Sequence, residues 1–232
     1  RKVCWCKFVL QKNSGVELTP AGYEMQKHCM EVFNSIKVMD ESIKEYSKES
    51  SGTVRVTANS SSITQFLPED FATFAKIFPK IKIKLKEKTS KDVILSVKEN
   101  LSDIGVFSEH VENTERLKII DYKHDTLVLV VPEYHPLVSK LTVKIEDFIK
   151  YEMVGLEKGS SLQAMIDKQV HKRNLKIKKK VETVSFEGVR GMVEAGLGIA
   201  VLPTGAIKPY LKSSKLKIIN IEEKWAKRSI KI

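Results

Sequence analysis

A strict alternation of four- and three-residue steps between apolar side chains limits how the first part of this chain can fold. The stripe comprises Met25, Cys29, Val32, Ile36, Met39, Ile43 and Tyr46. This spacing is typical of the seam of a two-stranded coiled coil. Thr19 is a good N-cap and Pro20 suits the first turn, so a helix is predicted over residues 20–47. The alternative is a helix packed on its own domain, but the narrow stripe favours pairing with a second copy.

A polar segment over residues 48–52 (KESSG) predicts a hinge, and strands alternate with helices beyond it. Strands are predicted at residues 53–58, 80–87 and 103–107, with helices at 64–78 and 91–100 between them. This β-α-β-α-β order requires a parallel sheet with right-handed crossovers. Two more strands are predicted at residues 117–121 and 126–132.

A second alternating unit follows, with strands predicted at residues 152–156, 176–183 and 198–202 and helices at 160–173 and 186–195. Short strands at residues 216–221 and 228–232 end the chain. Two similar halves predict an α/β protein of two lobes with a cleft between them. Ligands of such sheets bind at the carboxyl ends of strands, beside helix N-termini.

Serine and threonine recur at the turns that lead from a predicted strand to a predicted helix: Ser60, Ser61, Ser62, Thr89, Ser90, Ser160, Ser161 and Ser185. Each of them alone is more simply explained as an N-cap. Four such turns at corresponding places in two lobes favour a shared cleft that binds a small anion, with no cofactor. No acidic residue in these turns competes with an anion, and no arginine lies there either. The countercharge would therefore come from a lysine, or the ligand would be neutral.

The charge balance fits an anionic ligand without requiring one, because Lys and Arg outnumber Asp and Glu by 40 to 29. A basic field raises the local concentration of anions. A solvated lysine surface with no partner explains the same excess equally well.

Motifs for catalysis and for metal binding are missing from the sequence. Cys4 and Cys6 have the wrong spacing for a zinc site, and the five histidines form no pair at ligand spacing. No nucleophile elbow or phosphate-binding loop is found. Three cysteines favour a reducing compartment over a disulfide framework. With no apolar stretch that could span a bilayer, the expectation is a cytoplasmic protein that is not an enzyme and has no membrane partner.

Five segments together resemble the LysR-type transcriptional regulators. They are residues 16–22 (VELTPAG), 52–56 (GTVRV) with 66–68 (FLP), 102–106 (SDIGV), 129–132 (LVVP) with 135–137 (HPL), and 196–203 (GLGIAVLP). The resemblance implies a winged-helix DNA-binding domain, a linker helix that dimerises, and an effector domain with the type 2 periplasmic-binding-protein fold. Its implied partners are a small-molecule effector, DNA, RNA polymerase and further copies of the chain in a homodimer or tetramer.

The resemblance also implies domain boundaries. Residues 1–19 would be a remnant of the wing, and residues 20–50 the linker helix. The first effector-binding lobe would comprise residues 53–128 and 205–232, and the second residues 129–204, with flexing near residues 128–131 and 203–207. Most of the winged-helix domain, including the recognition helix, has no counterpart in the sequence. Weak or absent DNA binding is therefore expected of this chain.

The family's effector contacts map onto Ser61 and Ser90 in the first lobe and onto Ser160, Ser161, Ser185 and Phe186 in the second. Ser60, Ser62, Thr89 and Gly105 are candidates beside them. A second dimer contact would join the helix bearing Phe71, Phe74 and Phe78 to the partner's helix bearing Val189 and Met192. The alternative function is a solute-binding protein of a transport system, which would need a signal peptide and no coiled-coil helix. An enzyme on the same fold would need an acid, a base or a cofactor-bearing cysteine in the cleft.

Overall fold

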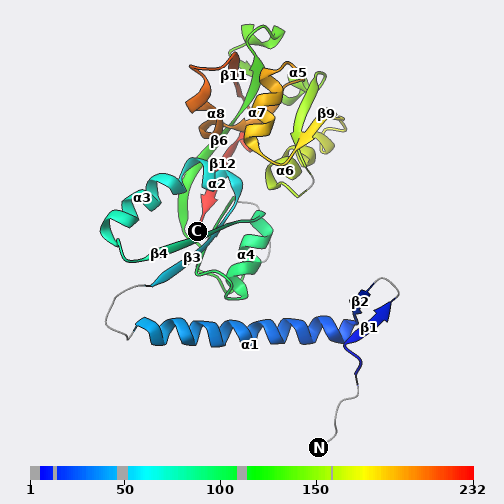
Figure 1. Cartoon of the computed structure of the whole chain (residues 1–232). Coiled ribbons are helices and arrows are strands. Elements are labelled where there is room, and N and C mark those ends of the chain that lie inside the picture. Colours follow the sequence, from blue (N-terminus) through cyan, green and yellow to red (C-terminus); the bar gives the residue numbers. More distant parts are fainter. Residues whose placement is uncertain (1–5, 13–14, 46–51, 109–113, 158) are drawn as a thin grey trace, which may run out of the picture.

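The computed structural model describes residues 6–12, 15–45, 52–108, 114–157 and 159–232. Its N-terminal part is a β-hairpin and one long helix. β1 (Val9–Lys12) pairs antiparallel with β2 (Gly15–Leu18), and α1 (Pro20–Glu45) extends away from the hairpin (Figure 1). Tyr46 and most of the predicted hinge lie outside the described residues.

Thr19 and Gly22 explain how the hairpin is attached to the start of α1. Thr19 Oγ1 accepts a hydrogen bond from Gly22 N at 3.0 Å and donates one to the carbonyl of Lys7 at 2.7 Å. The carbonyl of Phe8 accepts from Thr19 N at 3.0 Å. A Cβ at Gly22 would lie 2.0 Å from that same carbonyl oxygen, so only glycine fits there. The threonine is therefore an N-cap, as predicted, and the glycine permits close approach of the backbone.

The first lobe is a parallel α/β unit. Its elements are β3 (Thr53–Ala58), α2 (Ser60–Gln65), α3 (Leu67–Ile77), β4 (Lys82–Glu87), α4 (Ser90–Lys98), β5 (Ile104–Ser108) and the returning strand β12 (Lys227–Lys231). β3 pairs parallel with both β4 and β5, which confirms the predicted β-α-β-α-β unit. Val56, Ala58, Leu67, Val106 and Ile230 form the core of this lobe.

Two predicted elements of the first lobe are wrong. The single helix predicted over residues 64–78 is two helices that meet at Phe66. Pro68 explains the break, because a proline lacks the backbone donor and disfavours helix in the residue before it. The strand predicted over residues 117–121 is absent, since the next strand, β6 (Asp121–Pro132), begins only at Asp121.

The second lobe repeats the alternating pattern. Its strands are β7 (Thr142–Val143), β8 (Glu152–Leu156), β9 (Lys178–Thr183), β10 (Ala200–Pro203) and β11 (Leu216–Ile221). Its helices are α5 (Ile145–Phe148), α6 (Ser161–His171), α7 (Phe186–Glu194) and α8 (Thr204–Ile207), with 3-10 turns η1 (Pro136–Ser139), η2 (Lys208–Tyr210) and η3 (Lys224–Ala226). β8 pairs parallel with β9, and Met153 forms a parallel bridge with Ile199.

The long strand β6 belongs to both lobes. Its first half pairs antiparallel with β12, up to the pair Thr126–Lys227. Its second half pairs with β10 and β11. The chain therefore crosses between the lobes near Thr126 and again near Lys227 (Figure 1).

This pairing corrects the boundary expected near residue 204. The core that contains β8 and β10 also contains Ala206, Ile207, Leu216, Ile219, Ile221 and Ala226. Residues 205–226 therefore pack with the second lobe, and only β12 returns to the first. The second crossing lies near Lys227 and not at residues 203–207.

The predicted dimerisation residues differ in exposure. Met25, Val32, Ile36, Met39 and Ile43 are 44–61% exposed along α1, and Cys29 is also exposed. On the lobes, Phe78 and Met192 are exposed, and Phe71 and Phe74 are half-buried. Val189 does not fit the prediction, because it is 1% exposed within the core of its own lobe and cannot reach a partner.

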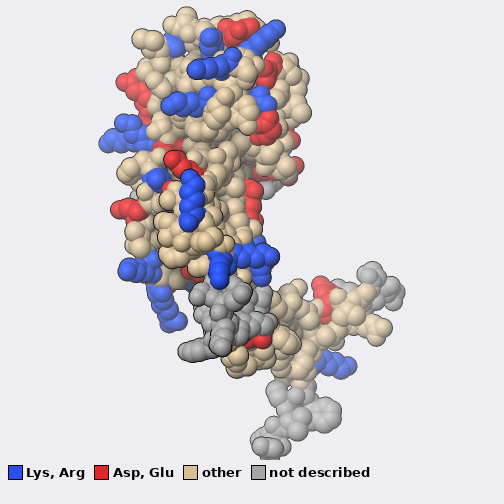
Figure 2. All heavy atoms as spheres, turned by 60° about the vertical axis from the view of Figure 1, so that its left-hand side comes forward, with Lys and Arg blue, Asp and Glu red and all other residues tan. Residues whose placement is uncertain are grey.

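Basic side chains do not gather into one patch on the face seen in Figure 2. Lys and Arg are spread over both lobes there and alternate with Asp and Glu. Within the described part of the chain, no helix is both long and apolar enough to cross a membrane.

Candidate functional site

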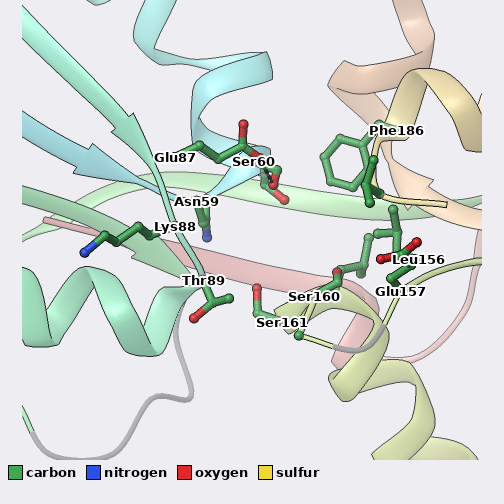
Figure 3. A pocket seen from close by; sticks show the side chains of 14 residues that line it. Asn59, Ser60, Glu87, Lys88, Thr89, Leu156, Glu157, Ser160, Ser161 and Phe186 are labelled. Carbon is green, nitrogen blue, oxygen red and sulfur yellow. Dashed lines mark hydrogen bonds between the residues drawn. The ribbon is translucent and has the colours of Figure 1, made fainter. Parts of the chain in front are cut away.

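A pocket of about 250 Å³ lies between the two lobes, where strand ends from both meet (Figure 3). Its walls combine polar turns with a few apolar side chains. The lining residues are Asn59, Ser60, Ser61, Glu87, Lys88, Thr89, Leu156, Glu157, Gly159, Ser160, Ser161, Leu162, Val184 and Phe186.

Asn59 organises the side of the pocket that the first lobe contributes. It follows β3, and its Oδ1 accepts hydrogen bonds from Ser62 N at 2.9 Å and Ser62 Oγ at 2.7 Å. Its Nδ2 donates to Ser90 Oγ at 3.1 Å and to Ser108 Oγ at 2.7 Å. The amide is 4% exposed, so all four bonds form away from bulk water. One side chain thus ties β3, α2, α4 and β5 together at the pocket.

The rim of the first lobe carries both signs of charge. Ser60 Oγ donates a hydrogen bond to Glu87 Oε1, which places a carboxylate in the wall. Lys88 donates from Nζ to Ser96 Oγ at 2.8 Å, and Figure 3 shows its side chain running away from the pocket. Thr89 caps α4 by accepting from Asp92 N. The charged end of Lys88 is therefore directed away from the pocket.

The second lobe contributes the turn from β8 into α6. Gly159 has a φ of +106°, which favours glycine and turns the chain sharply into the helix. Ser160 caps α6 by accepting from Gln163 N at 3.3 Å, and the buried Gln163 accepts from Leu156 N at 3.0 Å. Ser161 is the first residue of the helix and faces the first lobe in Figure 3. The first amides of a helix have no partner within it, so this end of the pocket offers donors.

Apolar side chains of the second lobe line the rest of the pocket. Phe186 at the start of α7 is 9% exposed, and Leu156 and Leu162 are buried beside it. Val184 is 76% exposed although it belongs to the lining. A ligand in this pocket therefore meets a mixed wall, with polar turns on both lobes and carbon surface on one.

Ser61 is backed by a buried arginine from the other end of the sequence. Its Oγ accepts a hydrogen bond from Arg228 Nη2 at 3.2 Å, and the same nitrogen donates to Asp125 Oδ2. Ser61, Arg228 and Asp125 are each 4% exposed. The sequence held no local signal for this contact, because Arg228 on β12 and Asp125 on β6 meet Ser61 only through the pairing of those strands.

Six of the ten predicted effector contacts line the pocket: Ser60, Ser61, Thr89, Ser160, Ser161 and Phe186. The other four do not. Ser62 and Ser90 are buried and bind Asn59, and Ser185 caps α7 by accepting from Gly188 N at 3.0 Å. Gly105 lies under α4, where a Cβ would come within 2.8 Å of Val93 and Val97. Gly105 thus serves the packing of helix on sheet.

The prediction that no acid competes for the site is wrong, because Glu87 and Glu157 both line the pocket. Glu87 ends one predicted strand and Glu157 follows another. Their positions next to the serine turns could therefore have predicted acidic residues in the pocket wall. Within the described residues, no group of three or more His, Cys, Asp or Glu side chains is arranged to hold a metal ion.

Comparison with known proteins agrees with the architecture. A family model described as LysR substrate binding domain matches residues 47–232. A protein of Trichormus variabilis named "Probable RuBisCO transcriptional regulator" is 26% identical over 219 residues, which cover 92% of this chain and 65% of that protein. The chain therefore spans just under two thirds of the length of this relative.

Solved structures share the two-lobed α/β fold. The regulatory domain of CcmR from Synechocystis PCC6803, solved in complex with 2-PG, superposes with a TM-score of 0.70 at 23% identity, covering 77% of this chain and 85% of that one. The effector binding domain of QuiR, in complex with shikimate, gives 0.67 at 22% identity, covering 78% and 85%. At these identities the likeness establishes the fold, which is the type 2 periplasmic-binding-protein fold of such domains.

Proposed function

Because the chain belongs to the LysR substrate-binding-domain family, we propose that it is the effector-binding and dimerising part of a LysR-type transcriptional regulator. In this proposal the interlobe pocket binds a small anion, and the apolar stripe of α1 joins two subunits. DNA binding and contact with RNA polymerase then belong to the whole regulator, whose transcription responds to the ligand. The main support is the pocket itself, in which serine-rich turns of two lobes face each other.

An anionic ligand is favoured by the donors around the pocket. Hydroxyls of Ser61, Ser160 and Ser161 lie at the first turns of helices, and α6 adds backbone N–H groups. The carboxylates of Glu87 and Glu157 oppose a purely anionic ligand and favour one that also carries hydroxyl groups. Shikimate, bound by the related QuiR domain, has this combination of a carboxylate and hydroxyls.

The test is a ligand screen by thermal shift, followed by calorimetry on every hit. The panel contains dicarboxylates, hydroxy acids, phosphorylated acids, aromatic acids, amino acids and neutral sugars. We expect a stabilising hit among the hydroxylated or phosphorylated acids. Ser161→Ala should weaken that ligand by about 1 kcal/mol, since it removes one hydroxyl donor without disturbing the cap at Ser160.

Ser139→Ala is the matched control, because Ser139 is an exposed serine of η1 outside the pocket lining. The affinity of the Ser139→Ala variant for the ligand found in the screen should equal that of the wild type. Hits confined to neutral compounds would contradict an anionic effector. An acid whose affinity is equal in the wild type and Ser161→Ala would contradict the role of this turn.

A further inference from the structure

We infer that Arg228, held by Asp125, positions Ser61 as a hydrogen-bond donor to an acceptor oxygen of the ligand. This inference rests on the proposed function, in that the pocket binds a small anion. It assigns a role in ligand selection to two residues that do not line the pocket themselves.

The side chains of Asp125, Arg228 and Ser61 form a buried hydrogen-bonded series that ends at the pocket wall. Asp125 and Arg228 are direct cross-strand partners on β6 and β12. Arg228 Nη2 donates both to Asp125 Oδ2 and to Ser61 Oγ, the latter at 3.2 Å. The side chains of Arg228 and Asp125 are 3% and 1% exposed. Of these three residues, Ser61 is the one that lines the pocket.

The chemistry of the three groups fixes the direction of the hydrogen bonds. A guanidinium only donates, whereas a serine hydroxyl has one donor and two acceptor sites. The Ser61 oxygen must therefore accept from Arg228, and its own O–H remains to donate elsewhere. A bond from a charged donor also polarises that O–H. A ligand oxygen beside Ser61 thus meets a donor, while a ligand N–H or O–H pointed at Ser61 is at a disadvantage.

The ion pair joins one guanidinium nitrogen of Arg228 to one carboxylate oxygen of Asp125. Arg–carboxylate pairs are frequently bidentate, with two parallel N–H···O bonds. Here Asp125 Oδ1 and Arg228 Nε are buried and have no hydrogen-bond partner within the described residues. Arg228 instead shares one nitrogen between the carboxylate and the pocket serine. Among the described residues, the second hydrogen bond of a bidentate pair is missing, and Arg228 contacts the pocket-lining Ser61.

The contrast with Ser62 shows that the donor is specific to Ser61. Ser62 lies one residue further along α2, and its Oγ donates its hydrogen bond to Asn59 Oδ1 at 2.7 Å. Ser60 Oγ donates to Glu87. Of the three consecutive serines, Ser61 is the one whose oxygen is already occupied by a cation.

The experiment follows sulfate and phosphate binding by amide NMR on the ¹⁵N-labelled chain, with sodium chloride holding the ionic strength constant. These two acceptor-rich anions are the probes. We expect saturable shifts at Ser61 and its neighbours in the wild type. The double substitution Asp125→Asn with Arg228→Gln removes both charges at similar volume, and it should weaken both anions about tenfold.

Ser61→Ala alone should weaken the anions to a similar degree. Adding Ser61→Ala to the neutral pair should then cause no further loss of anion affinity. The three residues act in one hydrogen-bond network, so the neutral pair already removes the contribution of Ser61. A role of Arg228 in packing alone would give additive losses instead. Arg55→Gln with Asp103→Asn is the matched control, since this ion pair lies in the same lobe and outside the pocket lining. Its anion affinity should be unchanged.

Several results would overturn the inference. They are wild-type Ser61 shifts absent with both anions, equal affinity in the neutral pair, or additive losses. If the neutral pair fails to fold, Ser61→Ala still puts the inference at risk, because unchanged affinity in that variant refutes the Ser61 donor on which it depends. An organic ligand found in the screen, without any sulfate or phosphate response at Ser61, would leave the proposed function standing and this inference refuted. Failure of every small molecule to bind would refute both.

Discussion

His135 shows how a single side chain of the second lobe responds to its surroundings. Its Nδ1 accepts from Leu137 N at 3.3 Å and so caps η1, with Pro136 at the first position. Its ring meets Tyr151 edge-on at 4.6 Å between centroids. Burial lowers the pKa of His135 below its ordinary value of 6.5. The folded chain therefore favours the neutral imidazole.

The lowered pKa of His135 gives stability a defined pH dependence. The unfolded chain binds a proton as pH falls through about 6.5, while the folded chain takes it up only at lower pH, so stability is lost on acidification. We expect the free energy of unfolding of the wild type to fall between about pH 7 and pH 5. His135→Asn, which keeps a capping oxygen, should flatten this part of the profile in urea titrations. His171→Asn is the control on an exposed histidine, and an unchanged slope in His135→Asn would contradict the assignment.

At the residue scale, the sequence predicted where polar groups gather but not what each one does. The serine and threonine turns at strand ends were visible, and five of those side chains line the pocket. Ser62 and Ser90 have the same local sequence signal as Ser61, yet Asn59 binds both of them internally. The bond to Ser62 comes from the N-cap of α2, whereas the bond to Ser90 depends on the packing of α4 beside β3. The contact of Arg228 with Ser61 depends likewise on strand pairing.

At the scale of elements, the described residues of the apolar stripe on α1 are exposed in the single chain. Ile36 is 51% exposed at the middle of that stripe. Ile36→Asp would bury a charge in a paired seam, and a mispaired charge costs several kcal/mol. We therefore expect the wild type to sediment as a dimer and Ile36→Asp to shift toward monomer.

Ser35→Asp provides the control for this seam prediction. It adds the same charge one residue away from the stripe, where Ser35 is exposed and donates to the carbonyl of Glu31. Its dimerisation should match that of the wild type. A wild-type chain that is monomeric at tens of micromolar, or equal shifts in both variants, would contradict the coiled-coil interpretation.

Periodicity predicted most elements because helices and strands impose different local spacings. The three parallel strands of the first lobe and the α6 and α7 helices lie close to their predicted places. β6 was predicted only as a shorter strand, since its first residues, Asp121 to Asp125, do not form an apolar run. Its change of partners at Thr126 could not be read, because pairing between distant strands leaves no local pattern. The misplaced lobe boundary followed from that.

At the scale of the whole molecule, one glutamine links the lobes beside the crossing strands. Gln65 Oε1 at the end of α2 accepts from Gly205 N of α8 at 3.0 Å, and its Nε2 donates to the carbonyl of Ser61 at 3.2 Å. Gln65→Ala should remove about 1 kcal/mol of local stability at this junction. Hydrogen exchange at the Gly205 amide should accelerate about fivefold in consequence.

The Ser62 amide, which is bonded within the first lobe, serves as the internal reference for that exchange. Gln26→Ala on the exposed surface of α1 is the control substitution. Unchanged exchange at Gly205 in Gln65→Ala would mean that this hydrogen bond does not hold the lobes together in solution.

The pair Thr126–Lys227 has a consequence for how such a protein can be rebuilt. These residues are cross-strand neighbours, so the two residues that flank the segment 127–226 are about 5 Å apart. In genetic terms the second lobe is a cassette inserted into the first, with both joints on adjacent strands. Recombination at these joints can replace Ser160, Ser161 and Phe186 together while Asn59, Ser61 and α1 stay as they are. Eight of the fourteen residues that line the pocket can therefore change in one event, while α1 is inherited unchanged.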